Sequence, residues 1–416
     1  MKYKPLSRLY HYKDNISFKN IAVNRKSSEA TCTLDLSIHG NNAFYINNNE
    51  ITKLIEDILL LSKQLNENLN ALPDIAIDYY MDKFLVDEIL ITNEIEGVYS
   101  TRKEIKSVLK KVNHTDEKSK VRFYGMVKKY IALLNDLETS LNSIEDLRNI
   151  YDQIILPEIT DKNDIPDGKY FRKGSVSVYS STQEEEHQGI LGEDNIIEHL
   201  NKLLKFKDDE NFPLLIRIAI IHYYMGYIHP FYDGNGRLSR FISSYLLKEC
   251  IPSIACVRLS YAIKENKAKY YNAFKCCNDT FNQGDVTPFI ITFLEIVKSA
   301  IENILEQTTE SISKLDYYSS CFVEILEKNL DNKKDIQHCI GILFILEQNA
   351  LFKRKPLTKT DLKKYSHLGD NSLKKYLLKL NSFGFNIKIQ NDKKSTKYSI
   401  DLNDFYNEQY GSNKAQ

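Results

Sequence analysis

The sequence predicts a mainly α-helical protein with one small β-hairpin and a C-terminal unit in which helices precede two strands. Apolar residues recur at helical spacing from Ile51 to about residue 305. Between Gly168 and Gly192 the apolar residues alternate with polar ones, which is typical of a hairpin. After about residue 332, helical stretches lead to a pair of short alternating segments near the C-terminus. We therefore expect a large helical body that carries two small β elements.

Composition limits the class of protein. The 416 residues are enough for two or three domains, and 42% hydrophobic with 27% charged residues is an ordinary soluble mixture. Lysine plus arginine and aspartate plus glutamate both total 56, so bulk charge indicates neither nucleic acid nor an anionic membrane as a partner. The seven cysteines lack metal-ligand spacing, which predicts reduced thiols in a cytoplasmic protein. The apolar runs are too interrupted to span a membrane.

The N-terminal part begins with irregular patterning and then becomes helical. Residues 1 to about 48 are expected to hold short strands or irregular structure, because β-branched stretches alternate with polar loops. Helices are predicted from Ile51 to Leu65 and from about Ile75 through Leu90, with the second ending in the sequence TNEIEG. Gly97 is a natural stop for that helix, because glycine adopts the left-handed conformation that closes helix ends.

The middle of the chain is predicted to be helical up to about residue 205, with the hairpin as an interruption. Helices are also expected at Ile196 to Leu204 and at Pro213 to Tyr227, and the latter leads directly to His229. His222 lies on that last helix. We expect a core histidine there rather than a metal ligand, because the sequence around it has no HExxH pattern.

The twelve residues from His229 to Arg240, HPFYDGNGRLSR, combine a base, an acid, two glycines and two arginines. Gly234 and Gly236 let the backbone turn tightly and bring amide N–H groups close to an anion, and Asn235 adds a side-chain donor. The residues that follow, SRFISSYLLKE, predict a helix. The turn therefore lies at a helix N-terminus, where free amides and the helix dipole favour phosphate.

Four further side chains complete the predicted phosphate site. Arg237 and Arg240 are three residues apart, so both can project from one face of the first helical turn towards the outer phosphates of a nucleotide. Asp233 is placed to hold Mg²⁺ together with phosphate oxygens and water. His229 precedes the turn and can accept a proton from a hydroxyl near neutral pH.

This segment resembles the signature of the Fic family, HPFx(D/E)GNGRxxR, and matches it at every specified position. The resemblance implies a Fic-type helical core in which the hairpin is a flap. It also implies a role for each motif residue, in which a base deprotonates the target hydroxyl, an acid holds Mg²⁺ and the remaining residues bind the nucleotide. These residues are the base His229, the metal ligand Asp233, and the nucleotide-binding Gly234, Asn235, Gly236, Arg237 and Arg240.

The activity implied by this resemblance is protein adenylylation. AMP would pass from ATP to a Ser, Thr or Tyr hydroxyl of a target protein, with release of pyrophosphate. A relative with lysine in place of the second motif glycine phosphorylates instead, and Gly236 argues against that reaction. Asn266 and Tyr270 stand where Fic proteins place groups near the nucleotide base, but tyrosines at helical spacing are more often core residues. Both therefore stay outside the predicted site.

A second resemblance lies upstream, in the helix predicted from about residue 76 to 97. Thr92, Glu96 and Gly97 are similar to the inhibitory pattern (S/T)xxxE(G/N) of many Fic proteins. The Glu96 carboxylate would then pair with Arg240 and occupy the cation that the γ-phosphate of ATP needs. The alternative is a solvated side chain, which is the usual state of a glutamate near a helix end. Glu94 is the neighbouring acid that does not fit the pattern.

Fic proteins carry a flap at the position of the predicted hairpin. The flap clamps a target segment by pairing its backbone with the backbone of the target, in the manner of an added strand. Here that role would fall on residues from Val176 to Gly189. The alternative is a surface loop without a partner.

The last hundred residues resemble a winged helix domain, because a helix-turn-helix pattern precedes a two-stranded hairpin with a basic tip. Such a domain can place its second helix, Ser372 to Leu380, in a DNA major groove. It can equally serve as a protein interaction or homodimerisation module, and both alternatives stay open. The lysines that would contact phosphates are Lys374, Lys375 and Lys379 on the helix, and Lys393, Lys394 and Lys397 at the hairpin tip.

Together these observations predict three parts. Residues 1–118 form a mainly helical region with the inhibitory helix, residues 119–308 the catalytic core, and residues 309–416 a linker helix with the winged helix-like domain. The leading interpretation is a self-inhibited adenylyltransferase that uses ATP and Mg²⁺ on a protein target. The alternative is a DNA-binding regulator in which the nucleotide site serves as a sensor.

Overall fold

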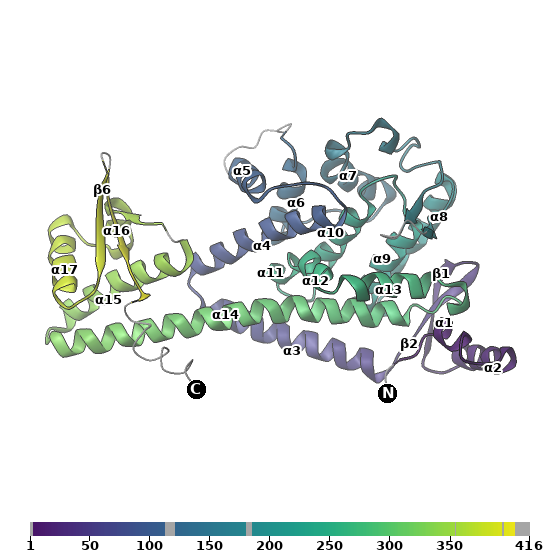
Figure 1. Ribbon diagram of the computed structural model, residues 1–416, viewed down its shortest axis with the longest axis horizontal. Coiled ribbons are helices and arrows are strands. Elements are labelled where there is room, and N and C mark those ends of the chain that lie inside the picture. The colour runs from purple at the N-terminus through teal and green to yellow at the C-terminus, as the bar shows by residue number, and fades with distance from the viewer. Residues whose placement is uncertain (1–2, 113–120, 180–184, 354, 393–394, 404–416) are drawn as a thin grey trace. The chain divides into compact units, whose positions relative to one another are not determined.

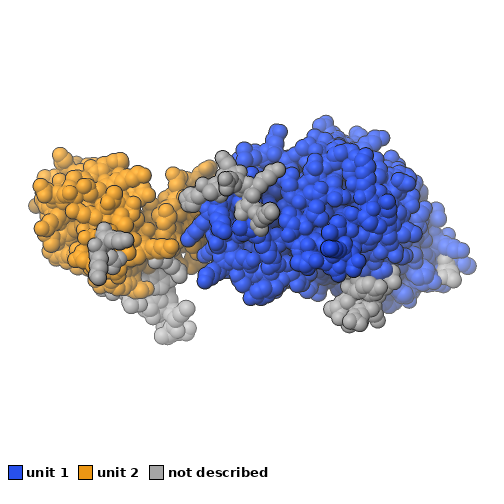
Figure 2. Space-filling view, turned by 90° about the horizontal axis from the view of Figure 1, so that it is seen from above, with its two compact units in different colours: residues 1–65, 83–304 blue, residues 66–82, 305–416 orange. Residues whose placement is uncertain are grey.

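The protein is mainly α-helical and divides into two compact units, as the computed structural model shows (Figures 1 and 2). Unit 1 holds residues 1–65 and 83–304, and unit 2 holds residues 66–82 and 305–416. The observed helices and small antiparallel sheets confirm the predicted fold class. The three-part division at residues 118 and 308 stays a prediction. The structure describes residues 3–112, 121–179, 185–353, 355–392 and 395–403.

Unit 1 begins with two helices and a β-hairpin. Its first elements are α1 (Leu6–Tyr10), α2 (Asn15–Lys26), β1 (Thr31–Ile38) and β2 (Asn41–Ile46). The expected strands are present, but the two helices were not predicted. The sequence of α2 shows no clear helical periodicity, because Ile16 and Val23 are exposed and its apolar residues do not form one buried face. Its start is set by Asp14, whose carboxylate accepts bonds from two backbone amides of the first turn.

The next two helices contribute residues to both units. They are α3 (Asn49–Ala71) and α4 (Asp74–Ile95). The first is longer than the predicted helix from Ile51 to Leu65, and the second begins and ends about two residues before the predicted range of 76 to 97. Gly97 ends α4 in the left-handed conformation, with φ of +73°, as expected for a helix stop. The last turn of α4 therefore includes Thr92 and lies just before Glu96.

The helical body of unit 1 surrounds α9 (Leu214–Ile228). Twelve of its 15 residues are buried, which is expected of a helix that is apolar on all sides. Its neighbour α10 (Asn235–Leu247) follows the motif loop and packs against it (Figure 1). The other helices of this body are α5 (Arg102–Val112), α6 (Tyr124–Leu134), α7 (Ile144–Ile154), α8 (Glu193–Lys207), α11 (Ser253–Cys256), α12 (Leu259–Glu265), α13 (Lys267–Asn278) and the first part of α14 (Thr287–Asn329), with short 3₁₀ turns η1 (Leu156–Glu158), η2 (Lys162–Asp164) and η3 (Thr280–Asn282).

The hairpin predicted between residues 168 and 192 is present. Its strands β3 (Ser177–Tyr179) and β4 (Glu185–Gln188) pair in antiparallel fashion, with Val178 opposite His187. Residues 180–184 at the turn lie outside the described part of the chain. The strands are thus shorter than the predicted flap, and the role in target binding stays a prediction.

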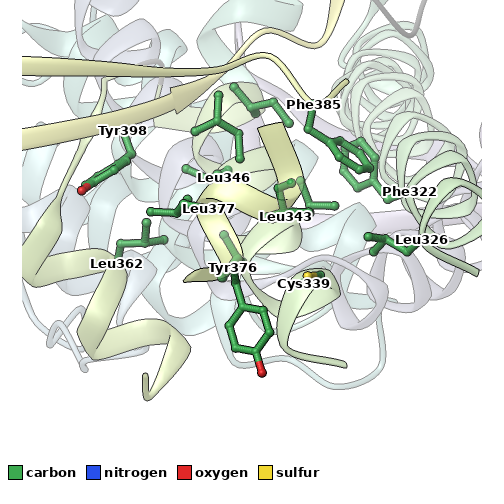
Figure 3. Packing of buried hydrophobic residues seen from close by; sticks show 14 of the residues in the cluster. Phe322, Leu326, Cys339, Leu343, Leu346, Leu362, Tyr376, Leu377, Phe385 and Tyr398 are labelled. Atoms are coloured by element: carbon green, nitrogen blue, oxygen red, sulfur yellow. The ribbon is translucent and has the colours of Figure 1, made fainter. Parts of the chain in front are cut away.

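Unit 2 contains a helix, a helix-turn-helix and a three-stranded sheet. Its core is formed by buried apolar residues that include Phe322, Leu343, Leu362 and Phe385 (Figure 3). The order of helix, helix-turn-helix and hairpin is the one expected from the sequence, but the third strand of the sheet was not predicted. The winged helix assignment stays a prediction. The elements are the end of α14, α15 (Lys333–Gln348), the π-helical turn η4 (Asn349–Lys353), β5 (Leu357–Thr358), α16 (Lys359–Ser366), α17 (Asp370–Ser382), β6 (Ile387–Asp392) and β7 (Ser395–Ile400), with strand order β5-β7-β6.

The lysines on α17 do not all lie free for phosphate. Lys379 is 2.7 Å and Lys375 is 3.8 Å from carboxylate oxygens of Asp335 on α15. Leu378, between them in sequence, has 61% of its surface exposed. The DNA-binding interpretation stays a prediction, and it requires these two cations to exchange an existing partner. Lys393 and Lys394 lie outside the described residues.

Two expected absences concern the described residues as a whole. No described helix is long and apolar enough to cross a membrane. All seven cysteines lie in the described part of the chain, and each has a free thiol.

Candidate active site

The motif loop is held by its own side chains. Helix α9 ends at His229, which adopts the left-handed conformation with φ of +53°, and α10 begins after Gly234 with φ of +81°. Between them, the Asn235 amide accepts a bond from the Phe231 N–H at 3.0 Å and donates one to the Phe231 carbonyl at 2.8 Å. The Asn235 side chain therefore closes the loop with its oxygen and one of its two N–H donors. Its expected role in nucleotide binding stays a prediction.

A buried arginine that the sequence interpretation missed holds the backbone of His229. Arg172 is fully buried, and its Nε donates to the His229 carbonyl at 2.8 Å. Its other nitrogens donate to the carbonyls of Gly174 and Ile190, at the two ends of the hairpin. One guanidinium group thus joins the hairpin base to the strained residue at the end of α9. No spacing rule marks a lone arginine whose partners are backbone carbonyls.

The imidazole of His229 is neutral near pH 7. Burial is the largest cause, and the nearby Arg172 and His187 add to it, so that the pKa of His229 falls to about 4. His187 comes from β4, and its Nε2 lies 2.6 Å from the Tyr227 carbonyl. A neutral imidazole can accept a proton, as the general base of a transfer reaction must.

Both motif glycines lie close to other side chains. A Cβ at Gly234 would lie 2.2 Å from the Ile155 side chain, and the positive φ there also disfavours other residues. A Cβ at Gly236 would lie 2.2 Å from Oε1 of Glu96. Gly236 thus leaves room for a carboxylate against the first turn of α10, at the end of the helix that favours anions.

The two motif arginines have different partners. Arg237 donates from Nη2 to Asp233 at 2.9 Å, and its Nε and Nη1 are buried with no hydrogen-bond partner among the described residues. Arg240 donates from Nη2 to Glu96 at 2.8 Å. It also donates from Nε to the Thr92 hydroxyl at 2.8 Å and from Nη2 to the Thr92 carbonyl at 3.1 Å. Arg240 is therefore bonded both to Thr92, in the last turn of α4, and to Glu96, directly after that helix.

Glu94 takes no part in this contact. Its carboxylate is 60% exposed and pairs with Lys264 of α12 at 2.8 Å. Two residues along a helix turn a side chain about 200° away, so Glu94 and Glu96 leave α4 in different directions. The distinction that the sequence pattern made between these two acids agrees with the geometry.

A cavity of about 220 Å³ lies beside the loop. Its wall includes His229, Asn235, Gly236 and Arg240 from the motif, together with Glu96. Helix α13 contributes aromatic and polar side chains to the same cavity, which are Tyr270, Tyr271, Phe274, Lys275 and Asn278.

The structure thus brings five of the predicted site residues to one cavity. The other three, Asp233, Gly234 and Arg237, belong to the loop but are not part of this wall. Of the two residues considered near a nucleotide base, Tyr270 lines the cavity and Asn266 does not. Asn266 instead donates from its amide to the Ala262 carbonyl at the end of α12.

His222 is a buried core histidine, as predicted. Its two ring nitrogens lie 2.7 Å from the Ser243 hydroxyl and 2.7 Å from the Tyr270 hydroxyl. Burial is the largest cause that lowers the pKa of His222 to about 3, and Arg240 adds to it. The neutral ring therefore links Ser243 of α10 to Tyr270, which lines the cavity.

The donor set for a metal is small. The Asp233 side chain is 40% exposed, and its oxygens accept bonds from the Gly234 N–H and from Arg237. Among the described residues, no group of three or more His, Cys, Asp or Glu side chains could hold a metal ion. One carboxylate suits Mg²⁺ when phosphate oxygens and water supply the other ligands, so Asp233 fits an ion that arrives with a nucleotide.

Comparisons with known proteins agree with this geometry. Residues 141–247 match the model of the Fic/DOC family. Proteins named "Protein adenylyltransferase Fic" from Drosophila virilis and Drosophila melanogaster are 31% identical over 93 residues, which is 22% of this chain and 17% of each relative. A crystal structure of a Fic family protein from Desulfovibrio desulfuricans has a TM-score of 0.52 at 18% identity, and the alignment covers 86% of this chain and 97% of that one. This last likeness shows a shared fold.

Proposed function

We propose that this chain, which carries a Fic domain at residues 141–247, is a protein adenylyltransferase that moves AMP from ATP to a Ser, Thr or Tyr hydroxyl of a target protein. The observation that carries the proposal is the cavity wall. A neutral imidazole at His229, the first turn of α10 and the Arg240 guanidinium face one cavity. The similarity to relatives named as protein adenylyltransferases supports the same reaction.

In the proposed reaction, His229 accepts the proton of the target hydroxyl on its neutral imidazole. The hydroxyl oxygen forms a bond to the α-phosphorus of ATP, and the bond from that phosphorus to the oxygen bridging to the β-phosphorus breaks. Pyrophosphate leaves with the electron pair of the broken bond. The amides of the first turn of α10 stabilise charge on the phosphate oxygens, while Arg237 and Arg240 are cations for the leaving phosphates.

Asp233 would hold Mg²⁺ in this proposal. The ion, when bound, neutralises charge on the phosphates. The Gly234 N–H and Arg237 fix the orientation of the Asp233 carboxylate, which remains partly exposed to an incoming nucleotide. Arg237 keeps two buried donors without a partner among the described residues, and it is suited to a phosphate oxygen for that reason.

The proposed regulation is inhibition by Glu96. A γ-phosphate and the Glu96 carboxylate are both anions that require the Arg240 guanidinium, so they compete. A charge-assisted hydrogen bond contributes about 1.5 to 3 kcal/mol, which corresponds to roughly ten- to a hundredfold in productive ATP binding. The additional bonds from Arg240 to Thr92 support the proposal, because they hold the guanidinium towards α4.

The experiment that tests the activity uses the Glu96→Gly variant with Mg²⁺ and ATP labelled at either the α- or the γ-phosphorus. Adenylylation places the α label on protein and leaves the γ label in pyrophosphate, whereas phosphorylation places the γ label on protein and leaves the α label in ADP. The matched control is the Glu96→Gly, His229→Ala double variant, which should transfer neither label. Absence of α label on every protein of a lysate would contradict the proposal and favour a nucleotide sensor without transferase activity.

A further inference from the structure

A buried carboxylate lies on α4 outside the cavity. Glu88 is fully buried, and it precedes Thr92 by four residues and Glu96 by eight. Residues at this spacing share one face of a helix. The same face of α4 therefore carries the two residues that hold Arg240 and, one turn earlier, an acid that the proposed reaction does not use.

The Glu88 carboxylate binds the beginning of α12. Its two oxygens accept the Ser260 N–H at 3.1 and 2.9 Å, and Oε1 accepts the Ser260 hydroxyl at 2.5 Å. The residue at the N-cap position of α12, Arg258, provides no capping side-chain bond. Helix starts leave free amides that favour an anion, so Glu88 caps α12 from another helix.

The groups around Glu88 make this contact costly to break. Burial raises the pKa of Glu88 to about 7, while the bonds from Ser260 and the charges of Arg240 and Arg258 act in the opposite direction. Tyr130 and Cys256 also face the carboxyl. Removing Glu88 would leave the buried amide of Ser260 without its side-chain acceptor. An unpaired buried amide costs free energy, so its loss disfavours the observed packing of α4 against α12.

The contact joins the two walls of the cavity. Helix α12 leads through Asn266 into α13, which carries Tyr270 and other residues of the cavity wall. Thr92 lies in the last turn of α4, and Glu96 follows directly after that helix. The Glu88–Ser260 contact thus fixes the position of one wall relative to the acid that extends from the other.

We propose that Glu88 is a positioning residue for the inhibitory contact: by capping α12 it holds α4 where Thr92 and Glu96 reach Arg240, and so it sets how strongly Glu96 restrains transfer. This inference rests on the proposed function. Glu88 touches no reacting atom of the proposed AMP transfer. Its loss lets the end of α4 withdraw from Arg240, which raises activity instead of lowering it.

The test is a set of variants made with and without Glu96→Gly. Glu88→Ala should raise the rate of AMP transfer by roughly two- to thirtyfold, the range in which residues away from a site alter coupling. The rise should appear mainly as a lower KM for ATP, because Arg240 becomes available. Glu88→Gln, which keeps an acceptor for the Ser260 amide, should raise it less. In the Glu96→Gly background all these rates should agree within about twofold, since no inhibitor remains to be positioned.

Two controls keep the test decisive. Glu94→Gln removes an exposed pair between the same two helices and should leave the rate unchanged, because such pairs contribute little. Ser260→Ala deletes only the hydroxyl contact, so it should cause a smaller rise in the transfer rate. If the melting curve of Glu88→Ala shows that this variant is unfolded, Ser260→Ala is the variant that tests the proposal. Equal effects in both backgrounds, or no rise in any folded variant, would overturn the proposal. If Glu96→Gly itself fails to activate, the proposed inhibition has failed, independently of Glu88.

Discussion

Arg237 and Arg240 lie one turn apart on α10 and are both buried, yet the carboxylates that pair with them come from different regions. Asp233 is four residues before Arg237, in the motif loop itself, and is 40% exposed. Glu96 is 144 residues before Arg240, directly after α4, and is 22% exposed. Arg237 retains two donors without a partner among the described residues, whereas Arg240 makes three bonds to the end of α4.

This difference indicates which of the two ion pairs can regulate the activity. The Arg237–Asp233 pair joins the motif loop to the first turn of α10, four residues along the chain, so it depends only on local structure. The Arg240–Glu96 pair depends on where a helix from another part of the sequence lies. A contact of the second kind can be broken by moving a segment far away in the sequence while the motif loop stays folded, which an inhibitory switch requires.

Removal of the base should have the largest effect and should spare both arginine pairs. His229→Ala is expected to lower AMP transfer by about 10²- to 10⁴-fold, which is the usual contribution of a general base. Nucleotide binding, measured by calorimetry, should be largely retained, because the imidazole acts on the hydroxyl and not on the phosphates. Near-wild-type transfer by this variant would show that His229 is not the base.

Breaking the local pair should cripple the reaction without relieving inhibition. Asp233→Ala removes the proposed Mg²⁺ ligand and leaves Arg237 without its partner, so we expect transfer to fall by about a hundredfold. The loss should be similar with Glu96 and with Glu96→Gly, because the Glu96 contact is on the other arginine. Full activity of Asp233→Ala, or wild-type activity that survives a chelator, would remove the metal assignment.

The dependence of the transfer rate on pH should report the lowered pKa of His229. The pKa of His229 is lowered to about 4, so the neutral, proton-accepting form is present above that pH and is lost only as the pH falls through it. In Glu96→Gly, kcat/KM for ATP should therefore change through this group by less than about twofold between about pH 8 and about pH 5.5. A histidine with the ordinary pKa of about 6.5 would lose roughly tenfold over the same range. A tenfold loss would contradict the described environment of His229.

The sequence predicted the contacts that depend on a local pattern. The motif loop, the helix that follows it and the stop at Gly97 all arise from residues close together in the chain, where turn chemistry and periodicity act. The separation of Glu96 from Glu94 follows in the same way, because helix geometry alone turns them apart. The long apolar helix before His229 was likewise readable from its composition.

Other contacts could not be predicted because their partners lie far away and carry no side-chain pattern. Arg172 binds backbone carbonyls from three segments, and Glu88 binds the amide and hydroxyl of a serine 172 residues later. Any arginine or glutamate can do this, so spacing gives no signal. The bonds that the Asn235 side chain makes to the backbone N–H and carbonyl of Phe231 were missed for a related reason, since backbone partners leave no pattern in the sequence.

The most direct measurement of the central claim compares AMP transfer by wild type, Glu96→Gly and Glu94→Gly over a range of ATP concentrations. Because Glu96 occupies the Arg240 guanidinium and Glu94 does not, we predict that Glu96→Gly is roughly ten- to a hundredfold faster at low ATP, while Glu94→Gly stays close to wild type. Arg240→Ala should be inactive with or without Glu96. Equal rates for wild type and Glu96→Gly at every ATP concentration, or activation by Glu94→Gly instead, would contradict inhibition through Arg240.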